Sequence, residues 1–160
     1  MGIYLNPGNN KFREASNSEI YIDKTMLISV TNKMMNTLKK NICISRPRRF
    51  GKSMAANMLA AYYGRDYDSK DLFKNLKIAN DESFETHLNK YDVIFFNMQE
   101  FLSRTNSVYE MIERIKKLVL RELIKSYPAC FVFYSKIPAY LKTPHHICLN
   151  VFQSFHRLIF

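Results

Sequence analysis

The 160-residue sequence lacks any continuous apolar run of the roughly 18 residues that a membrane-spanning helix needs. Its first segment, Met1–Glu14, is polar and has no apolar core of a secretory signal. The start also lacks a myristoylation signal, because Asn6 stands where Ser or Thr is required. Cysteines are few, odd in number and widely spaced: Cys43, Cys130 and Cys148. We therefore expect a cytoplasmic protein with buried free thiols and no membrane partner.

Acidic side chains are absent after Glu122, since all 14 acids lie at or before that residue. The stretch that follows carries four Lys or Arg residues and three of the four histidines, and no helical or strand period continues beyond Tyr134. Two interpretations of residues 127–160 are open. They form an atypical basic tail without ordered structure, or they are out-of-frame translation that truncates the gene product. The abrupt loss of acids favours the second.

The remaining composition indicates one globular domain or part of one. Hydrophobic residues make up 47% of the chain, which is enough for a buried core. The net charge is +10 and the isoelectric point is near 9.6. A basic balance of this size suits an anionic partner, such as a nucleotide or a nucleic acid, but does not indicate a fold.

The most informative segment is Asn41–Ser53, with the sequence NICISRPRRFGKS. It reads as a short apolar strand at Ile42–Ile44, a basic loop, and a helix that starts at Lys52. This order is typical of a loop that binds nucleotide phosphates. Gly51 would let the backbone approach a phosphate, Lys52 would place a charge between the terminal phosphates, and Ser53 would offer its hydroxyl to Mg²⁺.

The loop is a variant, because Arg46 occupies the position of the first glycine of the usual pattern. The predicted cofactor-binding residues are Arg46, Pro47, Arg48, Arg49, Phe50, Gly51, Lys52 and Ser53, with Ser53 as the metal contact. A basic surface turn is the structural alternative, with one or two arginines paired to acids of residues 65–85. A second functional alternative is that the three arginines bind nucleic-acid phosphates, although Phe50 is the one adjacent aromatic side chain for base stacking.

Alternating strand and helix signals predict an α/β fold with a mostly parallel sheet and flanking helices. The expected strands are Glu19–Ile22, Ile42–Ile44 and Asp92–Met98. The first expected helix is capped by Asp23 and ends near Lys40, and the second runs from Lys52 to Tyr63 with Gly64 as the stop. The third begins at a Ser107–Glu110 capping box and ends at about Lys125. Shorter helical pieces are expected at Leu72–Lys77 and Phe84–Asn89. In the first helix, Leu27, Val30, Met34 and Leu38 share one face. In the second, Met54, Met58 and Ala61 point inward.

Three other groups of residues are candidate sites. The first group could bind a metal but lacks a second close pair of ligands, so we expect no zinc site. Its members are His145, His146, Cys148 and His156. Glu100 follows a strand and would either contact Mg²⁺ or lie in solvent. Asp23 and Lys24 would either lie near the nucleotide or form a helix cap with a solvent-facing lysine, and the sequence favours the cap.

Three segments together resemble the AAA-ATPase-like family of bacteria and archaea, whose longer members carry a C-terminal PD-(D/E)XK nuclease-like domain. They are SEIYIDKTMLI (Ser18–Ile28), ICISRPRRFGKSMAANMLAAYY (Ile42–Tyr63) and YDVIFFNMQEF (Tyr91–Phe101). The resemblance covers about residues 1–126 and implies a P-loop NTPase fold, ATP as the nucleotide, and Arg46–Ser53 as the phosphate loop.

The chain departs from that family in one motif, an apolar strand ending in Asp-Glu that holds the magnesium ion. The later apolar segment Ala129–Tyr134 is followed by no carboxylate. The resemblance therefore implies an ATP-binding module with an incomplete sheet, which lacks the nuclease-like domain and does not hydrolyse ATP efficiently. A basic nucleic-acid-binding module and a non-functional truncated product are the alternatives, and dimers or rings are compatible with each.

Overall fold

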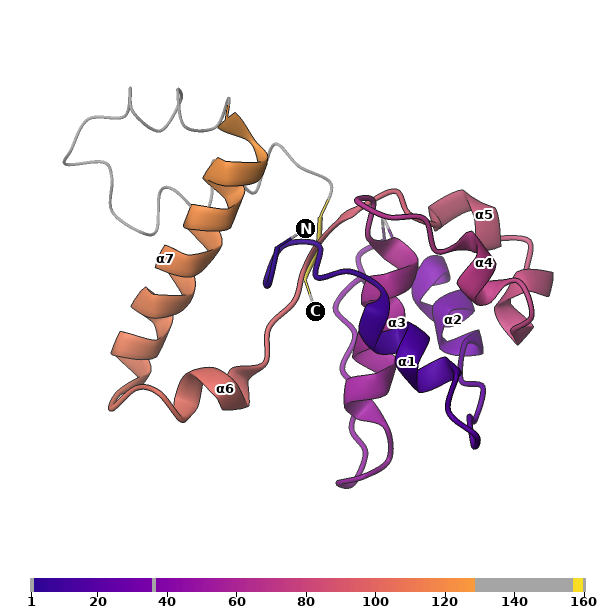
Figure 1. Ribbon diagram of the computed structural model, residues 1–160, viewed down its shortest axis with the longest axis horizontal. Coiled ribbons are helices and arrows are strands. Elements are labelled where there is room, and N and C mark those ends of the chain that lie inside the picture. The colour runs from indigo at the N-terminus through magenta and orange to yellow at the C-terminus, as the bar shows by residue number, and fades with distance from the viewer. Residues whose placement is uncertain (1, 36, 129–156, 160) are drawn as a thin grey trace. The chain divides into compact units, whose positions relative to one another are not determined.

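The computed structural model describes residues 2–35, 37–128 and 157–159. The chain divides into two compact units, of which one is Gly8–Tyr91 and the other combines Met1–Pro7 with Asp92–Phe160. The first unit contains α1 (Asn10–Ser16), α2 (Met26–Met34), α3 (Lys52–Tyr63), α4 (Lys70–Phe73), the 3-10 helix η1 (Lys77–Asn80) and α5 (Phe84–His87) (Figure 1). The second contains β1 (Asp92–Ile94), α6 (Met98–Leu102), α7 (Val108–Ser126) and β2 (Arg157–Ile159).

The core of the Gly8–Tyr91 unit forms around the C-terminal half of α3, where every residue from Met58 to Tyr63 is buried. α1 packs against α3 and contributes Phe12, whose ring stacks on Phe73 of α4 with centroids 5.1 Å apart. The ring of Tyr62 meets Phe73 edge to face at 5.6 Å. The predicted inward positions Met58 and Ala61 are confirmed, while Met54 in the first turn is half-buried.

The buried residues of α2 are polar except for Ile28, so the predicted apolar face is wrong. Val30 is 46% exposed, whereas Thr31 and Asn32 are buried against α3. The Thr31 hydroxyl lies 2.6 Å from the Tyr63 hydroxyl, which also donates to the Asn32 amide oxygen at 2.6 Å. Two tyrosine hydroxyls in the core need polar partners, and α2 supplies them.

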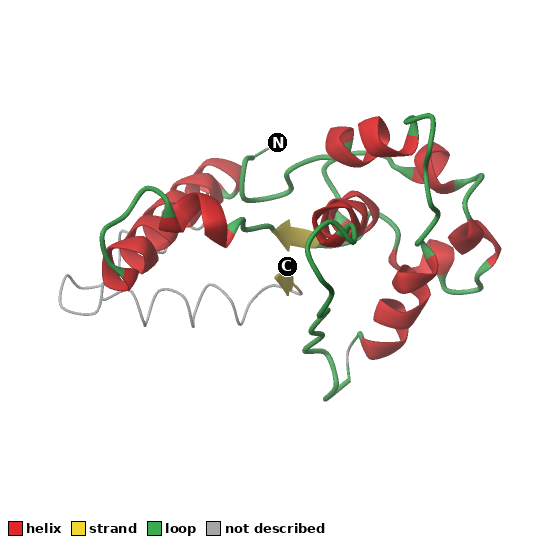
Figure 2. Cartoon of the chain, turned by 90° about the horizontal axis from the view of Figure 1, so that it is seen from below, coloured by secondary structure: helices red, strands yellow, loops and turns green. Residues whose placement is uncertain are grey.

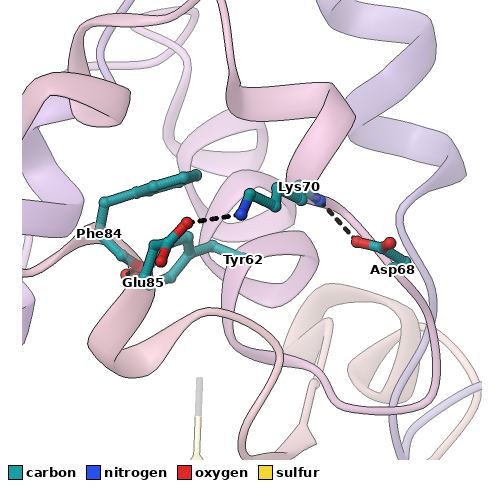
Figure 3. Close-up of polar contacts among 5 residues, drawn as sticks. All are labelled: Tyr62, Asp68, Lys70, Phe84 and Glu85. Carbon is teal, nitrogen blue, oxygen red and sulfur yellow. Dashed lines mark hydrogen bonds and ion pairs between the residues drawn. The ribbon is translucent and has the colours of Figure 1, made fainter.

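Tyr62 continues this network towards α5, where its hydroxyl donates to the main-chain carbonyl of Phe84 at 2.6 Å. Burial raises the pKa of Tyr62 to about 12, so the hydroxyl stays protonated and remains a donor. Figure 3 shows Tyr62 beside Phe84, and a dashed line from Lys70 to Glu85. The exposed Lys70 ammonium lies 2.5 Å from the Glu85 carboxylate. The main-chain N–H of Lys70, the first residue of α4, donates to the Asp68 carboxylate at 2.9 Å.

The long helix α7 dominates the second unit and begins where the capping signal predicts. The Ser107 hydroxyl accepts from the N–H of Glu110 at 3.1 Å. The Glu110 carboxylate accepts in turn from the N–H of Asn106 at 3.0 Å, one residue before the expected partner. The helix ends at Ser126, close to the predicted Lys125.

The N-terminal segment of the second unit is fixed to α7 by one carboxylate. Glu122 accepts hydrogen bonds from the main-chain N–H groups of Ile3, Tyr4 and Leu5 at 2.8–2.9 Å. An apolar cluster beside it contains Leu5, Ile94, Val119 and Leu123. Glu122 is the last acidic residue of the sequence, and it has a structural role here.

Two of the predicted strands are not formed in the described residues. Ile42 and Ile44 are 40% and 38% exposed in an irregular segment, which Figure 2 draws as loop up to α3. Residues 19–22 are likewise irregular. A strand needs a neighbour to pair with its N–H and carbonyl groups, and neither segment pairs with one among the described residues.

The third predicted strand is formed in part, because β1 covers Asp92–Ile94 and Met98 already belongs to α6. β1 pairs in parallel with β2. The α/β P-loop fold itself stays a prediction. In the part of the chain that the structure describes, no helix combines the length and apolar character needed to cross a membrane.

Candidate phosphate-binding loop

The basic loop leads directly into α3, which begins at Lys52 and ends at Tyr63 as the sequence predicts. Gly51 precedes the helix with φ of 76° and ψ of 24°, in the left-handed region that favours glycine. Arg49 is also left-handed, with φ of 66°. The first intrahelical bond runs from the N–H of Ala55 to the carbonyl of Gly51 at 2.9 Å. The N–H groups before Ala55 therefore have no acceptor within the helix.

The Lys52 side chain folds back over the loop rather than extending into solvent. Its ammonium donates to the main-chain carbonyls of Arg46 and Pro47, the latter at 3.1 Å. The Ser53 side chain is exposed in the first turn of α3. Lys52 and Ser53, two of the predicted site residues, thus share the N-terminal end of one helix with the loop backbone.

Lys24 also reaches this loop, a contact that the sequence did not predict. Its ammonium donates to the carbonyl of Phe50 at 3.1 Å. A Cβ atom placed on Gly51 would lie 3.3 Å from the same nitrogen. Lys24 is exposed, as the favoured interpretation expects, but its ammonium also contacts the loop backbone. One sequence signal could have predicted the contact between Lys24 and the loop: Asp23 and Lys24 lie in one of the three segments that carry the family resemblance.

Asp23 anchors the turn that carries Lys24, but it is not the predicted helix cap, because the N-cap residue of α2 is Thr25. Its carboxylate accepts from the N–H of Thr25 and from the N–H of Lys77, each at 2.8 Å. Burial raises the pKa of Asp23, but hydrogen bonds from Thr25 and Lys77 outweigh it and hold the pKa below the ordinary value. The carboxylate is therefore charged at neutral pH and stays bound to η1.

The three arginines of the loop are exposed, and Phe50 beside them is 59% exposed. Among residues 2–35, 37–128 and 157–159, none of Arg46, Arg48 and Arg49 forms an ion pair. Acids of residues 65–85 contact lysines instead, as in the exposed pair between Lys74 and Asp71 at 3.1 Å. The alternative interpretation, in which these acids pair with the loop arginines, is therefore not observed among the described residues.

The other candidate residues do not form a site in the described residues. Glu100 lies on α6, 3.6 Å from Arg104, in the favourable helical spacing. The candidate metal ligands His145, His146, Cys148 and His156 lie outside the described residues, as do Cys130 and the segment Ala129–Tyr134. Within the described residues, no cluster of three or more metal-ligating side chains occurs. Cys43 is exposed, so the expectation of a buried thiol is wrong there.

Comparison with protein families settles which family these features belong to. A family model described as a predicted AAA-ATPase matches residues 8–151. The chain belongs to this family. The matched part of this AAA-ATPase-like protein includes the whole loop, all of α1 to α7 and part of the segment after Ser126. The domain boundary expected at residue 126 stays a prediction. No curated protein and no solved structure matches the chain.

Proposed function

We propose that the chain binds ATP with Mg²⁺ through the loop Arg46–Ser53. Membership in a family of predicted AAA-ATPases makes a nucleoside triphosphate the natural ligand of such a loop. The observation that carries the proposal is the arrangement around Lys52. This lysine opens a 12-residue helix directly after a left-handed glycine, with its ammonium against the loop carbonyls.

The N-terminus of α3 supplies the electrostatics that a phosphate group requires. The N–H groups before Ala55 have no helical acceptor, and the helix dipole places partial positive charge at the same end. Lys52 and the loop arginines, which form no ion pair with any described residue, add full positive charges. Together these groups would stabilise an anion that carries several negative charges.

Ser53 supplies the oxygen that would contact magnesium. Its hydroxyl is exposed next to Lys52, and neutral and charged oxygen atoms are the ligands that Mg²⁺ prefers. The ion would neutralise charge on the terminal phosphates. The sequence has no apolar strand ending in Asp-Glu, so we assign no catalytic carboxylate and propose binding with inefficient hydrolysis.

Titration of the full chain with ATP and Mg²⁺ by calorimetry tests the proposal, with Lys52→Ala and Lys40→Ala measured in parallel. Lys40 is an exposed lysine outside the loop and serves as the control. We expect saturable binding to the parent and to Lys40→Ala, and a loss of at least about tenfold in Lys52→Ala, because charge-assisted hydrogen bonds to phosphate are lost. Equal ATP affinity of Lys52→Ala and the parent would refute the proposal.

The exposed arginines favour a second candidate, binding of nucleic-acid phosphates. Arg48, Arg49 and Phe50 together present two charges and one stacking ring to solvent. This candidate predicts DNA binding that falls steeply with salt and weakens when both arginines become glutamine. Negligible affinity for DNA at about 50 mM salt would remove it.

A further inference from the structure

We propose that Lys24 is a second phosphate-binding lysine of this site, which contacts the nucleotide phosphates and positions the loop. The inference rests on the proposed function of the loop. It names a residue that lies 28 positions before Lys52 in the sequence and outside the phosphate-loop pattern.

The turn that carries Lys24 is fixed on both sides. Asp23 accepts from the N–H and hydroxyl of Thr25, at 2.8 and 2.6 Å, and from the N–H of Lys77 at 2.8 Å. Thr25 is fully buried, and its hydroxyl oxygen accepts from the N–H of Ile78 at 3.2 Å. The main chain at Lys24 is therefore held against η1, and its side chain starts from a defined point.

The side chain ends on the loop backbone. The Lys24 ammonium lies 3.1 Å from the carbonyl oxygen of Phe50 and next to the open face of Gly51. An ammonium has three N–H donors, of which the carbonyl takes one. Lys24 is exposed, and in the described part of the chain no carboxylate pairs with it. Two donors and the full charge thus remain for a ligand at the loop.

Lys24 and Lys52 contact opposite ends of the loop. Lys52 binds the carbonyls of Arg46 and Pro47 at its start, and Lys24 binds that of Phe50 at its end. A triphosphate bound along the loop would therefore meet an ammonium at both ends. The contribution of Lys24 to affinity should grow with the number of phosphates on the nucleotide, because the interaction is with phosphate charge.

A purely structural role makes a different prediction. If Lys24 serves only to hold the Phe50 carbonyl, a neutral donor should replace it, and ATP, ADP and adenosine should be affected alike. Lys24→Gln keeps a donor and removes the charge, whereas Lys24→Arg keeps both the donors and the charge. These two variants separate charge from hydrogen bonding at one position.

The test is calorimetric titration of the full chain with ATP, ADP and adenosine, each with Mg²⁺. Lys24→Gln, Lys24→Arg, Lys52→Ala and the control Lys40→Gln are compared with the parent, and each melting temperature is measured without nucleotide. We expect Lys24→Gln to weaken ATP binding at least about tenfold, ADP binding less, and adenosine binding hardly at all. Lys24→Arg should retain most of the affinity, and Lys40→Gln all of it.

The outcomes separate the two proposals. If Lys52→Ala abolishes ATP binding while Lys24→Gln binds as the parent does, the role of Lys24 is refuted and the loop stands. Equal weakening of ATP and adenosine by Lys24→Gln also refutes it. If neither the parent nor any variant binds ATP, the proposed function itself fails. If Lys24→Gln melts well below the parent, the Lys24→Arg variant is used to test the proposal instead. A charge-dependent contact predicts that Lys24→Arg keeps the preference of the parent for ATP over adenosine, and loss of that preference in a folded Lys24→Arg protein refutes the role of Lys24.

Discussion

Both the sequence motif and the backbone geometry call for glycine at position 51. Its φ of 76° is costly for any residue with a Cβ atom, and the added carbon would lie 3.3 Å from the Lys24 ammonium. We expect Gly51→Ala to lower the free energy of unfolding by about 1–2 kcal/mol and to weaken ATP binding. Chemical denaturation and ATP titration measure the two effects. Arg48→Ala in the same loop should leave stability unchanged, and a Gly51→Ala protein as stable as the parent would contradict the argument.

Glu122 illustrates a charged residue with a purely structural role. Its carboxylate accepts three main-chain hydrogen bonds from the N-terminal segment, so its loss leaves three donors without this partner. We expect Glu122→Ala to destabilise the protein by about 2–4 kcal/mol in urea denaturation. The control is Glu113→Ala, which removes one partly exposed ion pair with Lys116 and should cost under about 1 kcal/mol. Similar losses in both variants would count against the three-bond anchor.

Asp81 should give the protein part of its acid sensitivity. Hydrogen bonds from Ser29 and Ser83 lower the pKa of Asp81 to about 2, below its ordinary value near 3.8. A carboxyl with a lowered folded-state pKa stabilises the protein above the unfolded value and loses that contribution as the pH falls towards 2. Melting temperatures measured between pH 6 and pH 2 should therefore fall less steeply for Asp81→Asn than for the parent. Parallel curves for the two proteins would show that Asp81 has no such role.

At the scale of single elements, α7 depends on the cap that the sequence predicts. Ser107 accepts the N–H of Glu110, which would otherwise lack a partner. Ser107→Ala should destabilise the protein by about 1 kcal/mol, whereas Ser107→Asp, which also caps, should not. Thermal unfolding followed by circular dichroism compares the variants. If alanine and aspartate have the same effect, the hydroxyl contributes nothing as a cap.

The accuracy of the predicted elements follows from where their signals lie. α3 and α7 are predicted closely because their capping signals and stripes are local, within a few residues of each end. The face of α2 is predicted wrongly because the hydroxyls of Tyr62 and Tyr63, some 30 residues away, decide which of its residues are buried. The segment Ile42–Ile44 looks like a strand by composition, yet a strand forms only with a partner.

At the scale of the whole molecule, the Gly8–Tyr91 unit holds both the loop and its own core. Its buried aromatic residues Phe12, Tyr62, Tyr63 and Phe73 contact one another within the unit. We expect residues 8–91, expressed alone, to melt cooperatively and to bind ATP with Lys52-dependent affinity. Differential scanning calorimetry and ATP titration test this. A broad, non-cooperative transition would mean that the unit needs the rest of the chain.

The sequence by itself determined the family, the candidate loop and the start of α3 at Lys52. These depend on contiguous residues, and their physical requirements are a glycine before a helix, a lysine at its first position and a hydroxyl beside it. Tertiary structure alone decided that Lys24 lies on Phe50, that α2 buries polar side chains, and that Glu122 holds the N-terminal segment. Each of these contacts joins residues 26 or more positions apart, so no local pattern could specify it.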